Sequence, residues 1–433
     1  MTFDISLLEP NDVSINLKLF KLLYIFPLFD PKSKTICNFN VYHLAWYIIN
    51  CVIGCIVVYG FFGYFTEMED EIDIVDQIQL IYMYLLYSVG LLKIATFLYK
   101  ANKIWDLLRV TNIHFLTSTQ CQTHIGILLK YRKKSIKISN TIICIGIVNT
   151  IQWTLYPQVL LLLQKFNAYQ SNRRFENIMN FRFPVTINDY NNNYVKFYMM
   201  ESSTAVFLFY INVVIDIFFI SICFVIIAQY EMIKRAYESV NSELNSENNN
   251  EKKNEFNVNN FEDLVSIMKD QQKLFAKLKL FYTTYKFIIL STVIINSGSM
   301  VILTFASVVV FTSSESMPIF GVIKLISAFG YMLIVLFFIC YLLERINNKM
   351  KSVHFGMYNS GNWTSMNLRS KKMLLLSMQL NNANEFMIKL TPRKIVNLQL
   401  FNSVIRININ IYIIIIYYNN IIYNHRITQI WIN

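Results

Sequence analysis

The chain has 433 residues and a mass of 51.1 kDa; 55% of its residues are hydrophobic and only 15% are charged. Soluble domains average about 45–50% apolar and about 25% charged residues, so this composition argues against a soluble enzyme, a disordered chain and a disulfide-rich secreted module. The net charge is +12, but the Lys and Arg residues lie between long apolar blocks, which favours a membrane protein and no nucleic-acid partner.

Seven apolar blocks follow an N-terminal segment, residues 1–42, that has no apolar stretch ending at a small-residue cleavage site. We therefore expect no cleavable signal peptide. A helix needs ~20 mostly apolar residues to cross a bilayer. The blocks that meet this length are residues 43–65, 77–98, 138–163, 201–228, 284–312, 319–342 and 395–423. They predict an all-α polytopic membrane protein with seven transmembrane helices.

The basic residues predict the orientation of these helices. Thirty of the 39 Lys and Arg residues lie in or directly beside the segments before the first block and after the second, fourth and sixth, and seven lie on the other side. Cytoplasmic loops are enriched in Lys and Arg. We expect a cytoplasmic N-terminus, an extracellular C-terminus, and no glycan on the sequon at Asn362, which would lie inside the cell.

The connection between the fourth and fifth blocks has two parts. Residues 241–260 are polar and low in complexity, which predicts disorder. Within residues 261–283, Leu264, Ile267 and Leu274 recur at helical spacing. This part predicts a helix that continues below the membrane into the fifth span; an amphipathic helix lying on the bilayer surface is the alternative.

No motif indicates catalysis. The seven cysteines form no CxxC pair and the five histidines are scattered, so we expect free thiols and no metal site. The zinc-protease, hydrolase, P-loop and dinucleotide-binding signatures do not occur. We expect a protein that is not an enzyme and needs no cofactor.

Three local motifs carry a resemblance to a known family. They are Phe183 and Pro184 in the second outer loop; Tyr358, Trp363, Lys371, Lys372 and Leu374–Leu376 after the sixth block; and Leu400, Phe401, Ser403 and Val404 at the start of the seventh. In their order across seven blocks, these motifs resemble the insect odorant receptor family, and a tuning receptor more than the shared co-receptor.

The resemblance implies an all-helical subunit of an odorant-gated, non-selective cation channel in the plasma membrane of sensory neurons. It implies two kinds of partner, a small volatile odorant and the co-receptor, with which the subunit would form a hetero-tetramer. It also implies an odorant pocket between helices in the outer half of the membrane and a pore lined by the last helix of each subunit.

This reading divides the chain into six regions. They are a cytoplasmic segment (1–42), the first four helices with the pocket (43–228), a cytoplasmic loop and helix extension (229–283), the fifth and sixth helices (284–342), a cytoplasmic anchor segment (343–394) and the last helix with its tail (395–433).

A pocket for volatile molecules needs aromatic surface and a few polar contacts. The outer halves of the second, third and fourth blocks supply such side chains. The predicted pocket residues are Tyr84, Tyr87, Trp153, Tyr156, Phe207 and Ile211. The alternative is that each packs against another helix or faces lipid.

Polar residues inside the blocks are the other candidates. Asp216 lies midway along the fourth block, where a carboxylate usually pairs with a cation; Lys93 and Lys324 are the possible partners. Asn402 and Ser403, in the last block, are predicted to line the pore. The alternative for them is hydrogen bonding between helices.

The tail from residue 407 departs from the family pattern. Of its 27 residues, 22 are Ile, Asn or Tyr, whose codons can all be built from A and T. We interpret this segment as translated intron sequence or a wrong gene model, and a divergent genuine helix is the alternative.

Three other classes share the seven-span plan or the membrane setting. A G-protein-coupled receptor should show Asp/Glu-Arg-Tyr after the third helix and Asn-Pro-x-x-Tyr in the seventh, and neither occurs. A transporter should show inverted repeats or paired broken helices, which we do not find. A gustatory receptor is the closest rival, although its Thr/Tyr-rich seventh-helix signature is not evident.

Overall fold

The computed structural model describes residues 13–24, 26–30, 35–36, 39–66, 74–166, 174–240, 250–312, 319–360, 366–383, 386–391 and 394–432. Its elements are α1 (Leu17–Leu22), α2 (Phe26–Phe29), β1 (Thr35–Ile36), β2 (Phe39–Asn40), α3 (Val41–Thr66), α4 (Ile74–Tyr99), α5 (Ala101–Leu108), η2 (Arg109–Thr111), α6 (Thr119–Thr123), α7 (Ile125–Phe166), α8 (Ile187–Asn192), α9 (Tyr194–Ser239), α10 (Asn250–Thr312), α11 (Ile319–Tyr358), α12 (Leu368–Ala383), β3 (Lys389–Thr391), β4 (Lys394–Ile395) and α13 (Leu398–Ile432).

Seven of these helices are at least 26 residues long, and each covers one predicted block: α3, α4, α7, α9, α10, α11 and α13. Six are long and apolar enough to cross a membrane, and α13 adds a shorter apolar stretch, Leu398–Ile414. The strands form only two short antiparallel pairs, β1–β2 and β3–β4. The prediction of an all-α protein with seven membrane helices is confirmed; its orientation in the cell stays a prediction.

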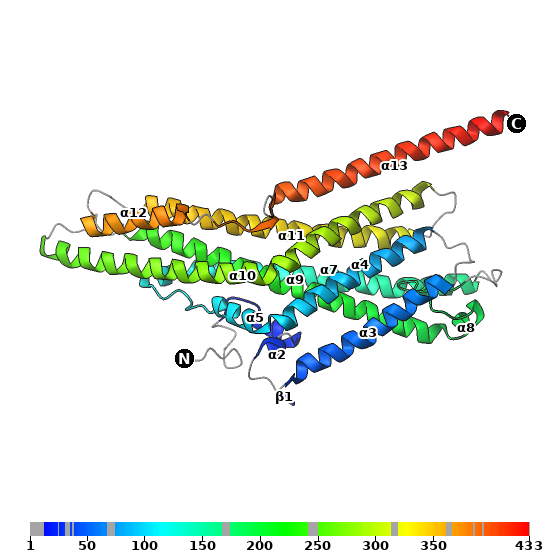
Figure 1. Cartoon of the computed structure of the whole chain (residues 1–433), viewed down its shortest axis with the longest axis horizontal. Helices are drawn as coiled ribbons and strands as arrows, with labels where there is room; N and C mark the ends of the chain where they lie inside the picture. The colour runs from blue at the N-terminus through cyan, green and yellow to red at the C-terminus, as the bar shows by residue number, and fades with distance from the viewer. Residues whose placement is uncertain are drawn as a thin grey trace.

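The centre of the bundle is α9. It packs against α4, α7, α10 and α11, and every residue from Ile211 to Tyr230 is buried. This helix is apolar around its whole circumference, which is the pattern of a helix enclosed on all sides. By contrast α3 leaves Val52, Val58 and Phe62 exposed in the single chain, an apolar surface suited to lipid. In Figure 1, α3 lies along the lower edge of the bundle, and α13 leaves it at the upper right.

Several helices extend beyond the predicted blocks. α10 runs without interruption from Asn250 to Thr312, so the predicted continuation of residues 261–283 into the fifth span is confirmed and the surface-lying alternative is wrong. The disorder predicted for 241–260 is wrong for 250–260, which begin α10; residues 241–249 lie outside the described residues. Once the buried Leu264 and Ile267 hold a turn in place, elongation adds one hydrogen bond for each residue, so polar residues can follow.

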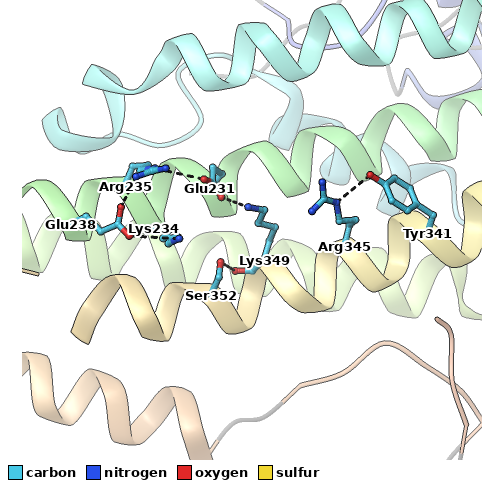
Figure 2. A network of polar contacts seen from close by, with 8 residues as sticks. All are labelled: Glu231, Lys234, Arg235, Glu238, Tyr341, Arg345, Lys349 and Ser352. Atoms are coloured by element: carbon cyan, nitrogen blue, oxygen red, sulfur yellow. Dashed lines mark hydrogen bonds and ion pairs between the residues drawn. The ribbon is translucent and has the colours of Figure 1, made fainter. Parts of the chain in front are cut away.

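A polar network joins two of the extended helices, α9 and α11, at the end of the bundle opposite α8. Figure 2 shows Glu231 of α9 facing Lys349 of α11, with 2.5 Å between carboxylate Oε2 and Nζ. Along α9, Arg235 bridges to Glu231 at 3.7 Å and to Glu238 at 3.0 Å. The Lys349–Glu231 bridge connects α11 to α9 and fixes the position of one helix along the axis of the other.

The connection between α5 and α7 is fastened to α10 by one buried carboxylate. Asp270 accepts hydrogen bonds from the backbone N–H groups of Thr117 and Ser118, both at 2.8 Å. Ser118 in turn caps α6 through its hydroxyl. A carboxylate that accepts backbone N–H groups holds an otherwise irregular segment in place. The predicted motif residue Trp363 and the sequon residue Asn362 lie outside the described residues.

Candidate functional site

The candidate site is a small, partly open cavity inside the helix bundle. It is lined by residues of α4, α7, α9 and α11 and by one loop residue, Met179. The volume of the cavity is about 60 Å³. Its lining residues are Tyr82, Met83, Leu86, Asn149, Thr150, Trp153, Met179, Ala205, Leu208, Phe209, Asn212, Val213 and Tyr331. None of these side chains carries a charge, and the aromatic and aliphatic ones dominate, as in most sites for small apolar ligands.

Most polar groups on the cavity wall already have partners. The Thr150 hydroxyl donates to the Gly146 carbonyl at 3.0 Å, and the Asn212 amide donates to the Leu208 carbonyl at 3.0 Å. The Asn149 side-chain oxygen accepts from the Ser327 hydroxyl of α11 at 2.9 Å, which ties α7 to α11. Polar residues in membrane helices usually satisfy themselves this way unless they serve a ligand.

The Trp153 Nε1–H and the Tyr331 hydroxyl differ from these groups. Both groups are buried and have no hydrogen-bond partner among the described residues. The Trp153 ring packs on Tyr82, with ring centroids 6.1 Å apart. The cavity therefore presents two buried donors in an aromatic wall.

Residues 174–186, the described part of the connection between α7 and α8, contribute to one side of the cavity. Met179 lines the cavity, and its backbone N–H donates to the Glu201 carboxylate of α9 at 2.6 Å, as does that of Phe181 at 3.2 Å. The Arg174 guanidinium donates to the Phe181 carbonyl at 2.8 Å. Asn180 adopts a φ of 52°, a left-handed turn that Asn tolerates. Glu201 thus fixes the position of Met179 and Phe181 along α9.

Lys324 of α11 reinforces the same corner. Its ammonium donates to the Ile178 carbonyl at 3.1 Å, and lies 4.4 Å from the Trp153 ring centroid and 5.0 Å from that of Tyr156. A cation over desolvated aromatic rings is worth about 2 kcal/mol. This contact restricts the orientation of the Trp153 indole, which lines the cavity.

Asp216, lower on α9, pairs with Lys93 of α4. The Lys93 Nζ lies 2.6 Å from Asp216 Oδ1, and both side chains are buried. Of the two possible partners predicted for Asp216, the structure selects Lys93. Lys324 lies instead beside Trp153 and Tyr156, as described above.

The six predicted pocket residues do not all face one space. Trp153 lines the cavity, and Tyr156 is buried beside it under Lys324. Ile211 lines a different, small cavity next to Trp46, and Phe207 packs on Trp46 with centroids 5.7 Å apart.

The two tyrosines predicted on α4 face α3. Tyr84 packs between Phe61 of α3 and Phe181 of the loop, with centroid separations of 4.8 and 6.1 Å. Tyr87 approaches Gly54 of α3, because a Cβ built on that glycine would lie 3.1 Å from the Tyr87 hydroxyl oxygen. Neither tyrosine lines the cavity that contains Trp153.

Some cavity residues were missed, and part of the signal was present in the sequence. Asn149 and Asn212 are polar residues inside apolar blocks, which marks candidate wet or ligand-facing positions. Asn149 lies four residues before Trp153, on the same helix face. For Met179 no local pattern exists, since this loop residue is brought into the bundle by contacts with distant segments, Glu201 of α9 and Lys324 of α11.

The predicted pore residues lie on one side of α13. Phe401, Val404 and Asn408 form its buried side, which packs against α10 and α11. Asn402 and Ser403 are exposed in the single chain. The Ser403 hydroxyl donates to the Gln399 carbonyl of its own helix at 2.8 Å. The helix–helix hydrogen bond considered as the alternative is instead made by Asn408, whose side-chain oxygen accepts from Thr304 of α10 at 3.5 Å.

Comparison with known proteins gives one family match and several structural ones. The 7tm odorant receptor family matches residues 73–409. A sequence comparison with curated proteins gives no significant match.

The fold is similar to that of a solved insect receptor. The structure of the olfactory receptor OR5 from Machilis hrabei aligns with a TM-score of 0.67 at 11% identity, over 92% of this chain and 97% of that one. The structure of the same receptor in complex with eugenol aligns with a TM-score of 0.64 at 12% identity, over 92% of this chain and 98% of that one. At such identities the likeness concerns the fold.

Proposed function

Because this chain belongs to the odorant receptor family, we propose that it is the odorant-binding, tuning subunit of a ligand-gated cation channel. In this proposal it acts in the plasma membrane of sensory neurons, in a hetero-tetramer with the shared co-receptor. Family membership selects an odorant receptor over the gustatory receptor and the G-protein-coupled receptor considered from sequence.

The observation that carries the proposal is the uncharged aromatic cavity between α4, α7, α9 and α11. Its wall offers rings for stacking and few polar groups, which suits a small volatile molecule. The similar receptor from Machilis hrabei has been solved with eugenol, and we propose a ligand of comparable kind, a small odorant, for this chain.

Support for the channel comes from α13. Gln399, Ser403, Arg406 and Asn410 are all exposed in the single chain, and their spacing of four, three and four residues places them on one stripe of the helix. A polar stripe on an otherwise apolar membrane helix is expected to face water or polar partners. We propose that this stripe, with Asn402 beside it, faces the permeation path of the assembled tetramer.

Co-expression with an insect odorant co-receptor, with currents recorded against an odorant panel, tests receptor function. We expect odorant-evoked cation current, and we expect Trp153→Ala to raise the half-maximal odorant concentration by about tenfold or more, because it removes a large aromatic wall and a donor.

Tyr87→Ala distinguishes the sequence-based pocket from the observed cavity. If Tyr87 contributes to the odorant site as predicted, its truncation shifts the response as well; if the cavity described here is the site, Trp153→Ala has the larger effect. Surface expression measured on the same cells separates binding from folding. Unchanged responses in both variants would exclude this location for the site.

Cysteine accessibility tests the pore assignment. Ser403→Cys and Asn402→Cys should make the odorant-evoked current sensitive to a charged methanethiosulfonate reagent, because these positions face the proposed water-filled path. Asn408→Cys is the matched control, since Asn408 is buried against α10. Equal sensitivity at all three positions, or at none, would remove α13 from the pore.

A further inference from the structure

We propose that the cavity selects neutral odorants that carry a hydrogen-bond acceptor, such as ketones, esters and ethers, over hydrocarbons of the same shape. This inference deepens the proposed function, because it takes the cavity as the odorant site. It rests on two buried donors without a protein partner, carried by residues that line the cavity, and on the hydrogen bonds already made by three other polar side chains of the wall.

Trp153 supplies the first donor. Only 6% of the residue is exposed, it lines the cavity, and its Nε1–H has no acceptor among the described residues. An indole N–H can donate but cannot accept. Since the ring is held by Tyr82 on one side and by the Lys324 ammonium, the indole cannot easily turn away to find a protein acceptor.

Tyr331 of α11 carries the second donor. This residue of α11 is 9% exposed and lines the same cavity, and its hydroxyl is also without a partner among the described residues. A buried polar group without a hydrogen bond costs about 1–3 kcal/mol. Two such groups on residues that line one cavity are suited to a ligand that accepts from them.

Three other polar side chains of the wall already make a hydrogen bond within the protein. The Asn149, Thr150 and Asn212 side chains are engaged with Ser327, Gly146 and Leu208. No charged side chain lines the cavity, which disfavours a carboxylate or ammonium ligand. The ligand that suits this cavity is therefore a neutral molecule with an apolar body and an oxygen atom that accepts a hydrogen bond.

Water does not change the direction of the selectivity. If water occupies the empty cavity and accepts from the two donors, a ketone oxygen replaces it, whereas a hydrocarbon displaces it and leaves both donors unpaired. Each hydrogen bond to a neutral acceptor contributes about 0.5–1.5 kcal/mol, which corresponds to an affinity difference of about 2- to 12-fold.

Pairs of ligands that differ only in the acceptor provide the test. Acetophenone and α-methylstyrene have nearly the same shape, with C=O exchanged for C=CH2; 2-octanone and 2-methyl-1-octene form a second pair. Binding is measured on the detergent-solubilised full chain as a ligand-dependent shift in thermal melting, which requires no current. We expect the ketone of each pair to bind more tightly, by about 2- to 12-fold for each hydrogen bond formed.

Variants assign the preference to the two donors. Tyr331→Phe keeps the ring and removes only the donor, so it should weaken ketone binding by about 2- to 12-fold and change alkene binding much less. Trp153→Phe removes the donor and part of the ring, so it should weaken ketone binding by a larger factor than alkene binding. Tyr285→Phe is the control, because the Tyr285 hydroxyl is likewise buried without a partner among the described residues but lies outside the cavity. It should change neither ligand.

The outcomes separate this inference from the proposed function. Equal binding within both pairs, no binding of any of the four compounds, or a ketone preference that survives both cavity variants would overturn the acceptor selectivity. Ketone-selective binding that evokes no current with the co-receptor would overturn the channel function and leave the selectivity standing.

Discussion

At the scale of single residues, buried charges are the least expected feature of this bundle. Lys93 and Asp216 lie 2.6 Å apart with both side chains buried. Glu201 is also buried, where it contacts Met179 and Phe181. Removing a charge from water is costly, so such groups persist where a partner compensates them. Here Asp216 is compensated by an ammonium and Glu201 by two backbone N–H groups.

Breaking the Lys93–Asp216 pair should destabilise the protein more than replacing it. Lys93→Met leaves a buried carboxylate without its cation, and we expect a loss of about 3–5 kcal/mol. The double variant Lys93→Met/Asp216→Leu removes both charges and should recover most of this loss. Thermal melting of the detergent-solubilised proteins measures both effects.

A double variant that melts as low as Lys93→Met, or lower, would contradict the compensation argument. Additive losses would show that each side chain acts through packing alone, without the other. A conservative control is Lys349→Met, which removes a cation from the more exposed bridge to Glu231. It should cost less, because pairs near water contribute about 0–1 kcal/mol.

At the scale of helices, close packing of α9 and α11 depends on one small residue. A Cβ built on Gly356 of α11 would lie 2.9 Å from the Lys234 backbone oxygen and 2.9 Å from its Cγ. Backbone cannot move aside as a flexible side chain can. The glycine therefore permits the approach that the Lys349–Glu231 bridge then fastens (Figure 2).

Gly356→Ala should destabilise the end of the bundle where α9 and α11 terminate, because the two helices must separate to admit a methyl group. We expect a loss of about 1–3 kcal/mol from overpacking, measured by thermal melting. Gly330→Ala is the matched control on the same helix: nothing lies within 4 Å of its Cβ position. That variant should be neutral or slightly stabilising, since Ala favours helix over Gly. Equal effects of the two substitutions would contradict this account.

At the scale of the whole molecule, the C-terminal tail departs from the family pattern. The family match ends at residue 409, close to residue 407, where the Ile-, Asn- and Tyr-rich tail begins. α13 continues as a helix to Ile432, and sequencing the transcript across Arg406 decides whether that segment is genuine. An in-frame intron at this point would confirm the interpretation made from composition.

The predicted orientation can be tested with an epitope tag on the N-terminus. We expect antibodies to reach the tag only after the cells are permeabilised, and we expect no glycan on Asn362, because the Lys- and Arg-rich segments should stay in the cytoplasm. A tag detected on intact cells would reverse the topology. It would then also place the cavity at the cytoplasmic end of the bundle.

The number and type of membrane helices could be derived from sequence alone, because spanning a bilayer depends on local composition summed over about 20 residues. The extension of α10 beyond its apolar block was also derived from sequence, from the helical spacing of Leu264 and Ile267. Trp153, predicted because aromatic residues suit an odorant pocket, lines the cavity that we propose as the site, and the choice of Asp216 as a paired charge followed from its position within an apolar block.

Only the tertiary structure decided which side chains share a space. The rotation of each helix about its axis determines that Tyr82 faces the cavity while Tyr84 and Tyr87 face α3, and it selects Lys93 over Lys324 for Asp216. Met179 reaches the cavity through a contact with Glu201, 22 residues away in the chain. Such arrangements depend on contacts between distant segments, which the local pattern of a sequence does not contain, whereas hydrophobic length is a local property that it does.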